Sequence, residues 1–141
     1  MIRYIIDSSA LWRLRRDRDL LGVWMEEITL RLIGSCPPQR VEFLRSASNA
    51  EEYECWRDDL VKLFPEIPLP KRIWSWVDTV QHQLAGQGVL GSVSPVDLMI
   101  CATAAHHGVT ILHDDKDFRT VARFVPGVVE LSINSRKRGK P

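Results

Sequence analysis

The order of apolar and polar positions divides this chain into short apolar runs and longer segments with helical spacing. Four short, largely apolar runs predict buried strands at residues 2–6, 32–36, 109–112 and 128–133. Between them, apolar residues three and four positions apart predict helices at residues 10–16, 19–32, 38–48, 51–64, 71–85 and 95–107, and a short helix near Phe118. Strands that alternate with helices indicate an α/β domain with a mostly parallel sheet.

Capping residues predict three of these helix boundaries. Ser94 and Pro95 are residue types favoured at the N-cap and first turn of a helix, and Asp97 stands at its third position. At the other end of this helix, Gly108 is typical of a C-terminal stop. Near the N-terminus, Ser8 or Ser9 can cap the helix at residues 10–16.

Helical spacing also predicts which side chains point inward. From the three middle helices we expect burial of Val41, Phe43, Leu44, Trp56, Leu60, Val61, Phe64, Ile73, Trp74, Val77 and Leu84. All five tryptophans, many for this length, are expected to make core or partner contacts.

The composition is that of an ordinary globular protein and does not indicate a function. A chain of 141 residues, 45% hydrophobic and 26% charged, suits one globular domain, expected at residues 1–134. Residues 135–141 are predicted to form a basic, disordered tail. The net charge of +1 gives no global basic field, so any nucleic-acid binding would depend on local patches.

Cysteines and hydropathy indicate where the protein resides. The three cysteines are odd in number and lack CxxC spacing, which fits reduced thiols. No stretch approaches a membrane span, and the N-terminus lacks the form of a signal peptide. We therefore expect a cytoplasmic protein with no membrane contact.

Acidic residues follow two of the predicted strands. Asp7 comes directly after the first strand, and Asp114, Asp115 and Asp117 come after the third. In parallel sheets the carboxyl ends of the strands meet at one edge, where functional residues gather. Together with Asp97 at a helix start, these acids form a plausible site for Mg²⁺ or Mn²⁺, which prefer oxygen ligands.

Three segments carry a resemblance to a known family. IIDSSAL (5–11), VEFLRSA (41–47) and SPVDLMICATAAHHGVTILHDDKDF (94–118) resemble the PIN-domain family, and specifically its VapC-type toxins. The likeness covers almost the whole chain, and the long C-terminal segment is its specific part. It implies a three-layer α/β/α sandwich, a Mg²⁺- or Mn²⁺-dependent endoribonuclease that acts as the toxin of a type II toxin–antitoxin pair, and a VapB-type antitoxin partner.

The resemblance also assigns roles to individual residues. It implies that Asp7, Asp97 and Asp115 bind metal and that Glu42 completes the catalytic acids, with Ser9 and Asp117 as accessory residues. The sequence departs from the family pattern in its last segment, where His113 replaces the usual threonine and Asp114 adds an acid. The choice among Asp114, Asp115 and Asp117 for the fourth acid therefore stays open.

Each acid also has an ordinary structural interpretation. Asp7 could cap a helix, Asp97 could belong to a capping box with Ser94, and Glu51 or Glu52 could take the role given to Glu42. Among the histidines, His106 and His107 suit a helix C-terminus, whereas His113 stands nearer the predicted acids.

Partners and competing functions follow from the same features. RNA is the expected substrate, with flanking phosphates bound by Arg13, Arg15, Arg16, Arg119 or the tail, and Trp12 as a candidate RNA contact. The apolar helices at 19–32 and 51–85 are candidate surfaces for a homodimer or the antitoxin. The alternatives are a non-catalytic RNA- or protein-binding module on the same fold, or a receiver-like Mg²⁺-binding signalling domain.

Overall fold

A four-stranded parallel sheet forms the centre of the computed structural model, which describes residues 1–136. The strands are β1 (Tyr4–Ile6), β2 (Ile33–Gly34), β3 (Thr110–His113) and β4 (Glu130–Ser132), in the spatial order β2-β1-β3-β4. Their pairing is parallel throughout, with Ile5 opposite Gly34 on one side and Ile111 on the other. The predicted parallel sheet is therefore confirmed.

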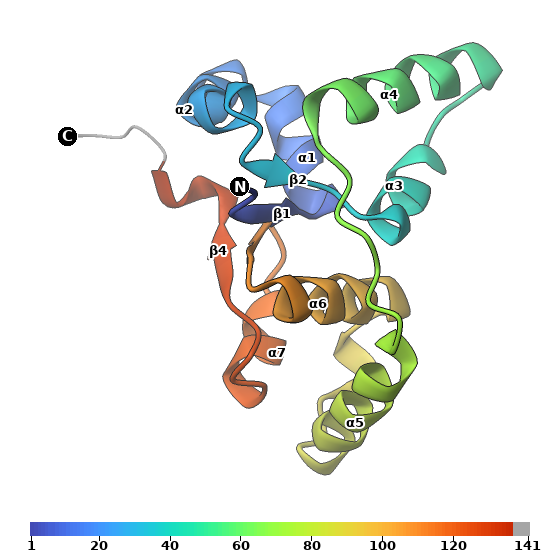
Figure 1. Cartoon of the computed structure of the whole chain (residues 1–141), viewed down its shortest axis with the longest axis vertical. Helices are drawn as coiled ribbons and strands as arrows, with labels where there is room; N and C mark the ends of the chain where they lie inside the picture. The colour runs from blue at the N-terminus through green and yellow to red at the C-terminus, as the bar shows by residue number, and fades with distance from the viewer. Residues whose placement is uncertain (137–141) are drawn as a thin grey trace.

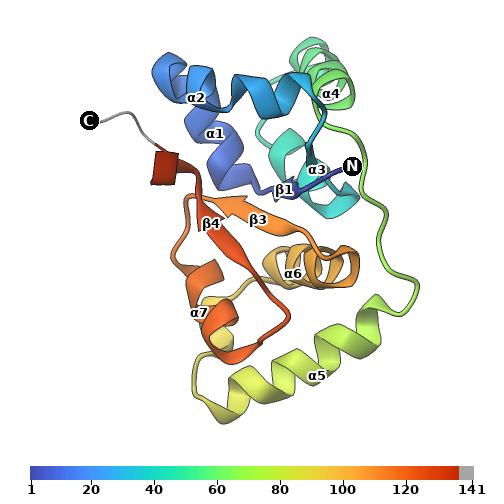
Figure 2. The same ribbon diagram turned by 60° about the vertical axis from the view of Figure 1, so that its left-hand side comes forward.

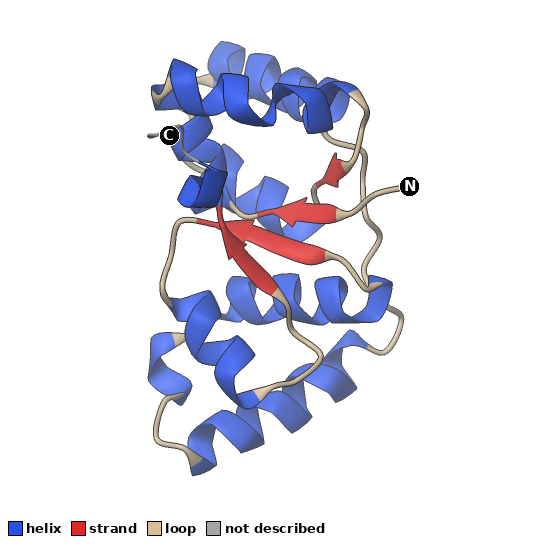
Figure 3. Ribbon diagram, turned by 90° about the vertical axis from the view of Figure 1, so that its left-hand side faces the viewer, coloured by secondary structure: helices blue, strands red, loops and turns tan. Residues whose placement is uncertain are grey.

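Helices cover both faces of this sheet (Figures 1 and 2). Viewed along the sheet, the strands lie between an upper and a lower group of helices (Figure 3). The helices and short 3-10 turns are α1 (Ser8–Arg16), α2 (Arg18–Thr29), α3 (Pro37–Leu44), α4 (Ala50–Leu63), α5 (Ile73–Gly86), η1 (Leu90–Ser92), α6 (Pro95–His107), α7 (Asp117–Phe124) and η2 (Ile133–Arg136). The arrangement is the three-layer α/β/α sandwich that the resemblance implied.

Two hydrophobic cores lie on opposite faces of the sheet. Ile5 and Ile111 join the core beneath α5, α6 and α7, whereas Ile6 and Leu112 join the core beneath α1, α2 and α4. Consecutive residues of a strand point to opposite faces, so a fully covered sheet needs apolar residues at every position. This explains why the strands appear in the sequence as uninterrupted apolar runs.

Three residues that were predicted to point inward are exposed. Val41 on α3 is 66% exposed and Trp74 on α5 is 67% exposed. In α3 the buried side includes Gln39 and Phe43, and a buried glutamine is invisible to a hydrophobic pattern. In α5 the buried stripe runs through Val77 and its neighbours at helical spacing, which leaves the Trp74 ring outside it. Val61 on α4 is likewise exposed.

Several helix ends differ from the sequence prediction by a few residues. Helix α2 stops at Thr29 because Arg31 adopts a left-handed conformation (φ 58°), which turns the chain into β2. Helix α3 stops at Leu44, and Asn49 caps a new helix soon afterwards. By contrast, α6 spans the predicted residues 95–107, and Gly108 ends it with φ 68°.

The C-terminal segment begins inside the described part of the chain. The predicted tail starts at Ser135, but Ser135 and Arg136 belong to η2, and the guanidinium of Arg136 lies 4.2 Å from the centroid of the Trp24 ring. The other tail residues, 137–141, lie outside the described residues. Among residues 1–136, no helix has both the length and the apolar character needed to cross a membrane.

Candidate metal centre and active site

A polar cavity of about 410 Å³ opens at the carboxyl edge of the sheet. Its lining residues follow the ends of β1 and β3 or lie on or beside α1, α3, η1, α6 and α7. They are Asp7, Ser9, Glu42, Gly91, Ser92, Ser94, Asp97, Asp115 and Asp117. Residues separated by up to about a hundred positions meet here because β1 and β3 are adjacent parallel strands.

Asp7 lies at the end of β1 and is also the N-cap of α1. One carboxylate oxygen, Oδ2, accepts hydrogen bonds from the Ser9 backbone N–H (3.0 Å) and the Ser9 hydroxyl (2.6 Å). The expectation that Ser8 or Ser9 caps this helix was therefore wrong. The other oxygen, Oδ1, is buried and has no hydrogen-bond partner among residues 1–136.

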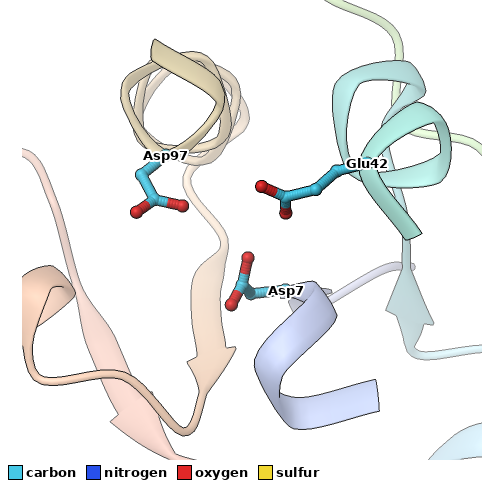
Figure 4. A group of neighbouring side chains, drawn as sticks. All are labelled: Asp7, Glu42 and Asp97. Atoms are coloured by element: carbon cyan, nitrogen blue, oxygen red, sulfur yellow. The ribbon is translucent and has the colours of Figure 1, made fainter. Parts of the chain in front are cut away.

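Glu42 and Asp97 point toward Asp7 from two other elements (Figure 4). Glu42 lies on α3, and Asp97 lies in the first turn of α6, where the Asp97 N–H donates to the Ser94 hydroxyl oxygen (3.1 Å). One carboxylate oxygen from each of the three residues lies within 4.8 Å of the others. Asp7 thus combines its expected role as a helix cap with a place in the cavity, and Asp97 lies in the cavity one turn after the Ser94 cap.

The electrostatics of this group are unfavourable without a cation. Burial, followed by the charges of Asp7, Glu42 and Asp115, raises the pKa of Asp97 to about 7. Burial and the Asp7 charge raise the pKa of Glu42, and burial raises the pKa of Asp7 despite its hydrogen bonds from Ser9. Each carboxylate therefore resists ionisation of its neighbours.

The turn between β3 and α7 supplies the remaining acids. Asp115 and Asp117 form a second group with Asp97, again with oxygens within 4.8 Å of one another. The Asp117 N–H donates to Asp115 Oδ1 (2.9 Å), and burial together with the Asp115 charge raises the pKa of Asp117. Asp97 belongs to both groups and joins them into one acidic centre.

Asp114 has a different environment from its neighbours. Its side chain accepts from the Asn134 amide (3.0 Å) and lies 3.6 Å from the Arg13 guanidinium, outside the cavity lining. Its backbone N–H donates to the Ser9 hydroxyl oxygen (2.9 Å), so Ser9 connects this turn to Asp7. Of the three acids left open by the sequence, Asp115 and Asp117 face the cavity and Asp114 does not.

The other candidate residues lie away from the cavity. Glu52 accepts from the Ser48 N–H in a capping box at the start of α4, and neither it nor Glu51 lines the cavity. His107 contacts the Pro68 carbonyl oxygen (2.8 Å) at the far end of α6. Trp12 packs against Phe43, with ring centroids 4.6 Å apart, and so contributes to the core.

Sequence reasoning missed the η1 side of the cavity. Gly91 and Ser92 line it, together with Ser94 in its capping role. The sequence signal was available, because these residues directly precede the helix that carries Asp97 and include the glycine typical of an exposed loop.

The donor set fits a hard divalent cation. Among the described residues 1–136, only carboxylate and hydroxyl oxygens face the cavity from side chains. Mg²⁺ and Mn²⁺ prefer such ligands over the nitrogen and sulfur ligands typical of zinc. The Asp7 carboxylate, whose Oδ1 is buried and unpartnered among residues 1–136, faces the carboxylates of Glu42 and Asp97 (Figure 4), and a cation bound between them would satisfy all three.

Comparisons with known proteins agree on one family. Residues 4–124 match the model of the PIN domain. The ribonuclease VapC6 of Mycobacterium tuberculosis H37Rv is 46% identical over 98 residues, which cover 70% of this chain and 77% of that protein. The ribonuclease VapC21 of the same strain is 32% identical over 133 residues, which cover 91% and 92% of the two chains.

Solved structures share the fold at low sequence identity. A chain of VapBC-1 from nontypeable Haemophilus influenzae aligns with a TM-score of 0.77 and 15% identity, covering 96% of this chain and all of that one. A chain of DNA-bound VapBC from Salmonella typhimurium aligns with a TM-score of 0.75 and 12% identity, covering 94% and 99%.

Proposed function

This chain belongs to the PIN-domain family, and from that premise we propose that it is a Mg²⁺- or Mn²⁺-dependent endoribonuclease. We further propose that it is the toxin of a type II toxin–antitoxin pair, since its relatives over most of its length are named VapC ribonucleases. Its reaction is the hydrolysis of phosphodiester bonds in RNA.

The observation that carries the proposal is the Asp7 carboxylate, which has one buried oxygen without a partner among residues 1–136 and lies within 4.8 Å of the carboxylates of Glu42 and Asp97. A buried carboxylate oxygen without a partner costs free energy, and nearby like charges add to that cost. A divalent cation would remove both penalties at once. The arrangement is therefore explained by cation binding and not by the needs of the fold.

In this mechanism Asp7, Asp97 and Asp115 would hold the cation, and Glu42 would complete the acidic centre. A bound Mg²⁺ or Mn²⁺ lowers the pKa of a water molecule and offsets the charge that develops on the phosphate. Ser9 orients Asp7 through its two hydrogen bonds to Oδ2. No side chain is required as a nucleophile.

Basic residues outside the cavity are proposed to bind the flanking phosphates of the RNA. Arg16 and Arg119 are exposed and available for this role. Arg13 lies against Asp114 and Asn134, and the guanidinium of Arg15 lies 5.1 Å from the centroid of the Trp56 ring. Since the protein as a whole is nearly neutral, RNA would be held by these local charges.

An antitoxin of the VapB type is the proposed protein partner. The solved structures with this fold include complexes titled VapBC. An apolar groove of about 340 Å³ between α1, α2 and α4 is lined by Leu21, Leu60 and Trp56 among others and offers a surface for it. An arginine inserted from such a partner into the acidic cavity would substitute for the cation charge. A homodimer acting in the cytoplasm is the proposed free form.

The test is RNA cleavage by the purified chain with and without added Mn²⁺ or Mg²⁺. Asp7→Asn and Asp97→Asn are expected to reduce the rate at least about 100-fold, the size of effect seen when a principal electrostatic group is removed from an active site. Asp114→Asn is the matched control, because its side chain lies outside the cavity, and it should retain activity. Metal-independent cleavage, or full activity in Asp7→Asn, would refute the mechanism.

A binding experiment separates catalysis from simple RNA binding. Isothermal titration of the metal-free chain with Mn²⁺ should show binding that Asp97→Asn abolishes. A chain that binds RNA but neither binds Mn²⁺ nor cleaves would instead be a non-catalytic module on the same fold.

A further inference from the structure

The turn that carries Asp115 and Asp117 rests on a buried histidine. His113, the last residue of β3, is only 1% exposed, and its ring packs against Phe118 with centroids 5.3 Å apart. It does not line the acidic cavity. A polar ring in such a position needs partners for both of its nitrogens.

Both ring nitrogens of His113 have a partner. Nδ1 accepts a hydrogen bond from the backbone N–H of Asp115 (3.1 Å), and Nε2 lies 2.6 Å from the Glu130 carboxylate on the neighbouring strand β4. A backbone N–H can only donate, so Nδ1 must carry the lone pair, and the proton of the neutral ring must be on Nε2. The Glu130 carboxylate accepts the hydrogen bond that this Nε2–H donates, and so favours the same tautomer.

We propose that His113 and Glu130 are a positioning pair for the acidic centre. Glu130 fixes the tautomer of His113, and His113 in turn holds the backbone of Asp115 so that its carboxylate faces Asp97. Neither residue contacts the cavity, so their role is indirect. The inference rests on the proposed metal-dependent function and identifies what orients one of its ligands.

A change at His113 would affect the whole turn between β3 and α7. Asp115 Oδ1 accepts the Asp117 N–H, so a shift of the Asp115 backbone would also displace Asp117. On the other side, the Asp114 N–H is held by Ser9. Losing the His113 contact frees the backbone N–H of Asp115, and the cost of ordering that residue would then reduce the free energy of metal binding.

Three variants separate positioning from packing. His113→Phe keeps an aromatic ring against Phe118 but removes both hydrogen bonds. His113→Asn loses the ring and leaves a void, yet its Oδ1 occupies nearly the position of Nδ1 and can accept the Asp115 N–H. Glu130→Gln keeps the fold, but its amide can donate to Nε2 of His113, which permits the wrong tautomer.

Glu66→Gln is the matched control, because Glu66 forms an ion pair with Arg40 away from the cavity.

The measurements are the dissociation constant for Mn²⁺ alone, by titration calorimetry on the full chain, and the melting temperature without metal. We expect His113→Phe to weaken Mn²⁺ binding about 10- to 100-fold, the range for loss of an outer-shell partner. His113→Asn should regain most of that affinity although it melts at a lower temperature than His113→Phe. Glu130→Gln should weaken binding several-fold, and Glu66→Gln should not.

Kinetics provide a second readout. With Mn²⁺ below saturation, His113→Phe should lower kcat for RNA cleavage and leave KM for the RNA nearly unchanged, because the pair acts on the metal ligand and not on the substrate.

A purely structural role predicts a different result. If Mn²⁺ affinity follows the melting temperatures, or if His113→Asn binds as weakly as His113→Phe, the positioning pair is overturned. If Glu130→Gln behaves like Glu66→Gln, the tautomer argument fails. A wild-type chain that binds no Mn²⁺ would overturn the proposed function and this inference with it, whereas wild-type binding with unaffected variants overturns only the inference.

Discussion

Two opposing effects act on the ionised carboxylate of Asp97. A negative charge in the first turn of α6 is favoured by the free N–H groups there. Burial and the charges of Asp7 and Glu42 outweigh that benefit, since the pKa of Asp97 is raised to about 7. The ionised residue therefore destabilises the metal-free fold, as expected at a site shaped for binding and not for stability.

We predict that Asp97→Asn stabilises the metal-free protein. Above about pH 7 the free energy of unfolding should rise by roughly 1–3 kcal/mol, because a penalised charge is removed and the amide keeps the local hydrogen bonding. Urea denaturation in the presence of a chelator measures it. The control is Asp78→Asn on the exposed side of α5, expected within about 0.5 kcal/mol of wild type. A destabilised Asp97→Asn would contradict the prediction.

The same shift predicts the pH dependence of stability. Asp97 has a pKa of about 7 in the folded protein, against 3.8 for the same carboxyl group in an unfolded chain. The folded state thus binds more protons between these values, so the free energy of unfolding falls as pH rises through that window. The raised pKa values of Asp7 and Glu42 act in the same direction.

Melting curves of the metal-free chain should show that its stability falls as the pH rises from about 5 to about 8. Saturating Mn²⁺ should reduce this decline, because the cation binds only the ionised carboxylates. A metal-free stability that increases with pH over this range would contradict the assigned direction.

At the scale of elements, the sequence predicted where helices begin and end better than it predicted which face of each helix is buried. Helix α6 has the predicted limits because Ser94, Pro95 and Gly108 act within a turn of each end. The buried faces of α3 and α5 were predicted less well, because Val41 and Trp74 are apolar yet lie opposite the packing surface. Which face is buried depends on neighbouring elements, and these are remote in sequence.

Two glycine substitutions compare a glycine that ends a helix with a glycine inside a helix. Gly108→Ala should destabilise the protein by about 1 kcal/mol, because Gly108 has φ 68° and alanine is strained there. Gly22→Ala should stabilise it by about 0.5–1 kcal/mol, because Gly22 is exposed inside α2 with open space around its Cα. Urea midpoints measure both, and equal effects of the two changes would contradict the prediction.

At the scale of the molecule, η2 ties the C-terminal strand back to the N-terminal helices. The indole N–H of buried Trp24 on α2 donates to the Ile133 carbonyl oxygen (2.9 Å). Arg136 pairs with Glu27 and donates to the Tyr4 hydroxyl (3.2 Å). Asn134, in the same short segment, binds Asp114 beside the acidic turn, so this closure also supports the edge of the site.

We predict that Trp24→Phe destabilises the protein by about 2–3 kcal/mol, since it removes the bond to Ile133 and leaves a cavity beside η2. The matched control is Trp74→Phe, at a position 67% exposed, which should change the free energy of unfolding by less than about 0.5 kcal/mol. Chemical denaturation followed by circular dichroism compares them. A loss in Trp74→Phe as large as in Trp24→Phe would show that η2 closure is not the cause.

The sequence by itself determined what depends on neighbours along the chain: the parallel α/β class, the limits of α6, and acids at two strand ends and a helix start. The resemblance to a family added Glu42, which no local signal distinguishes from other helical glutamates. Only the tertiary structure decided that Glu42 meets Asp7 and Asp97, and that Asp114 turns away from the cavity toward Arg13. These outcomes depend on strand order and helix packing, where the interacting residues are distant in sequence and periodicity carries no information about them.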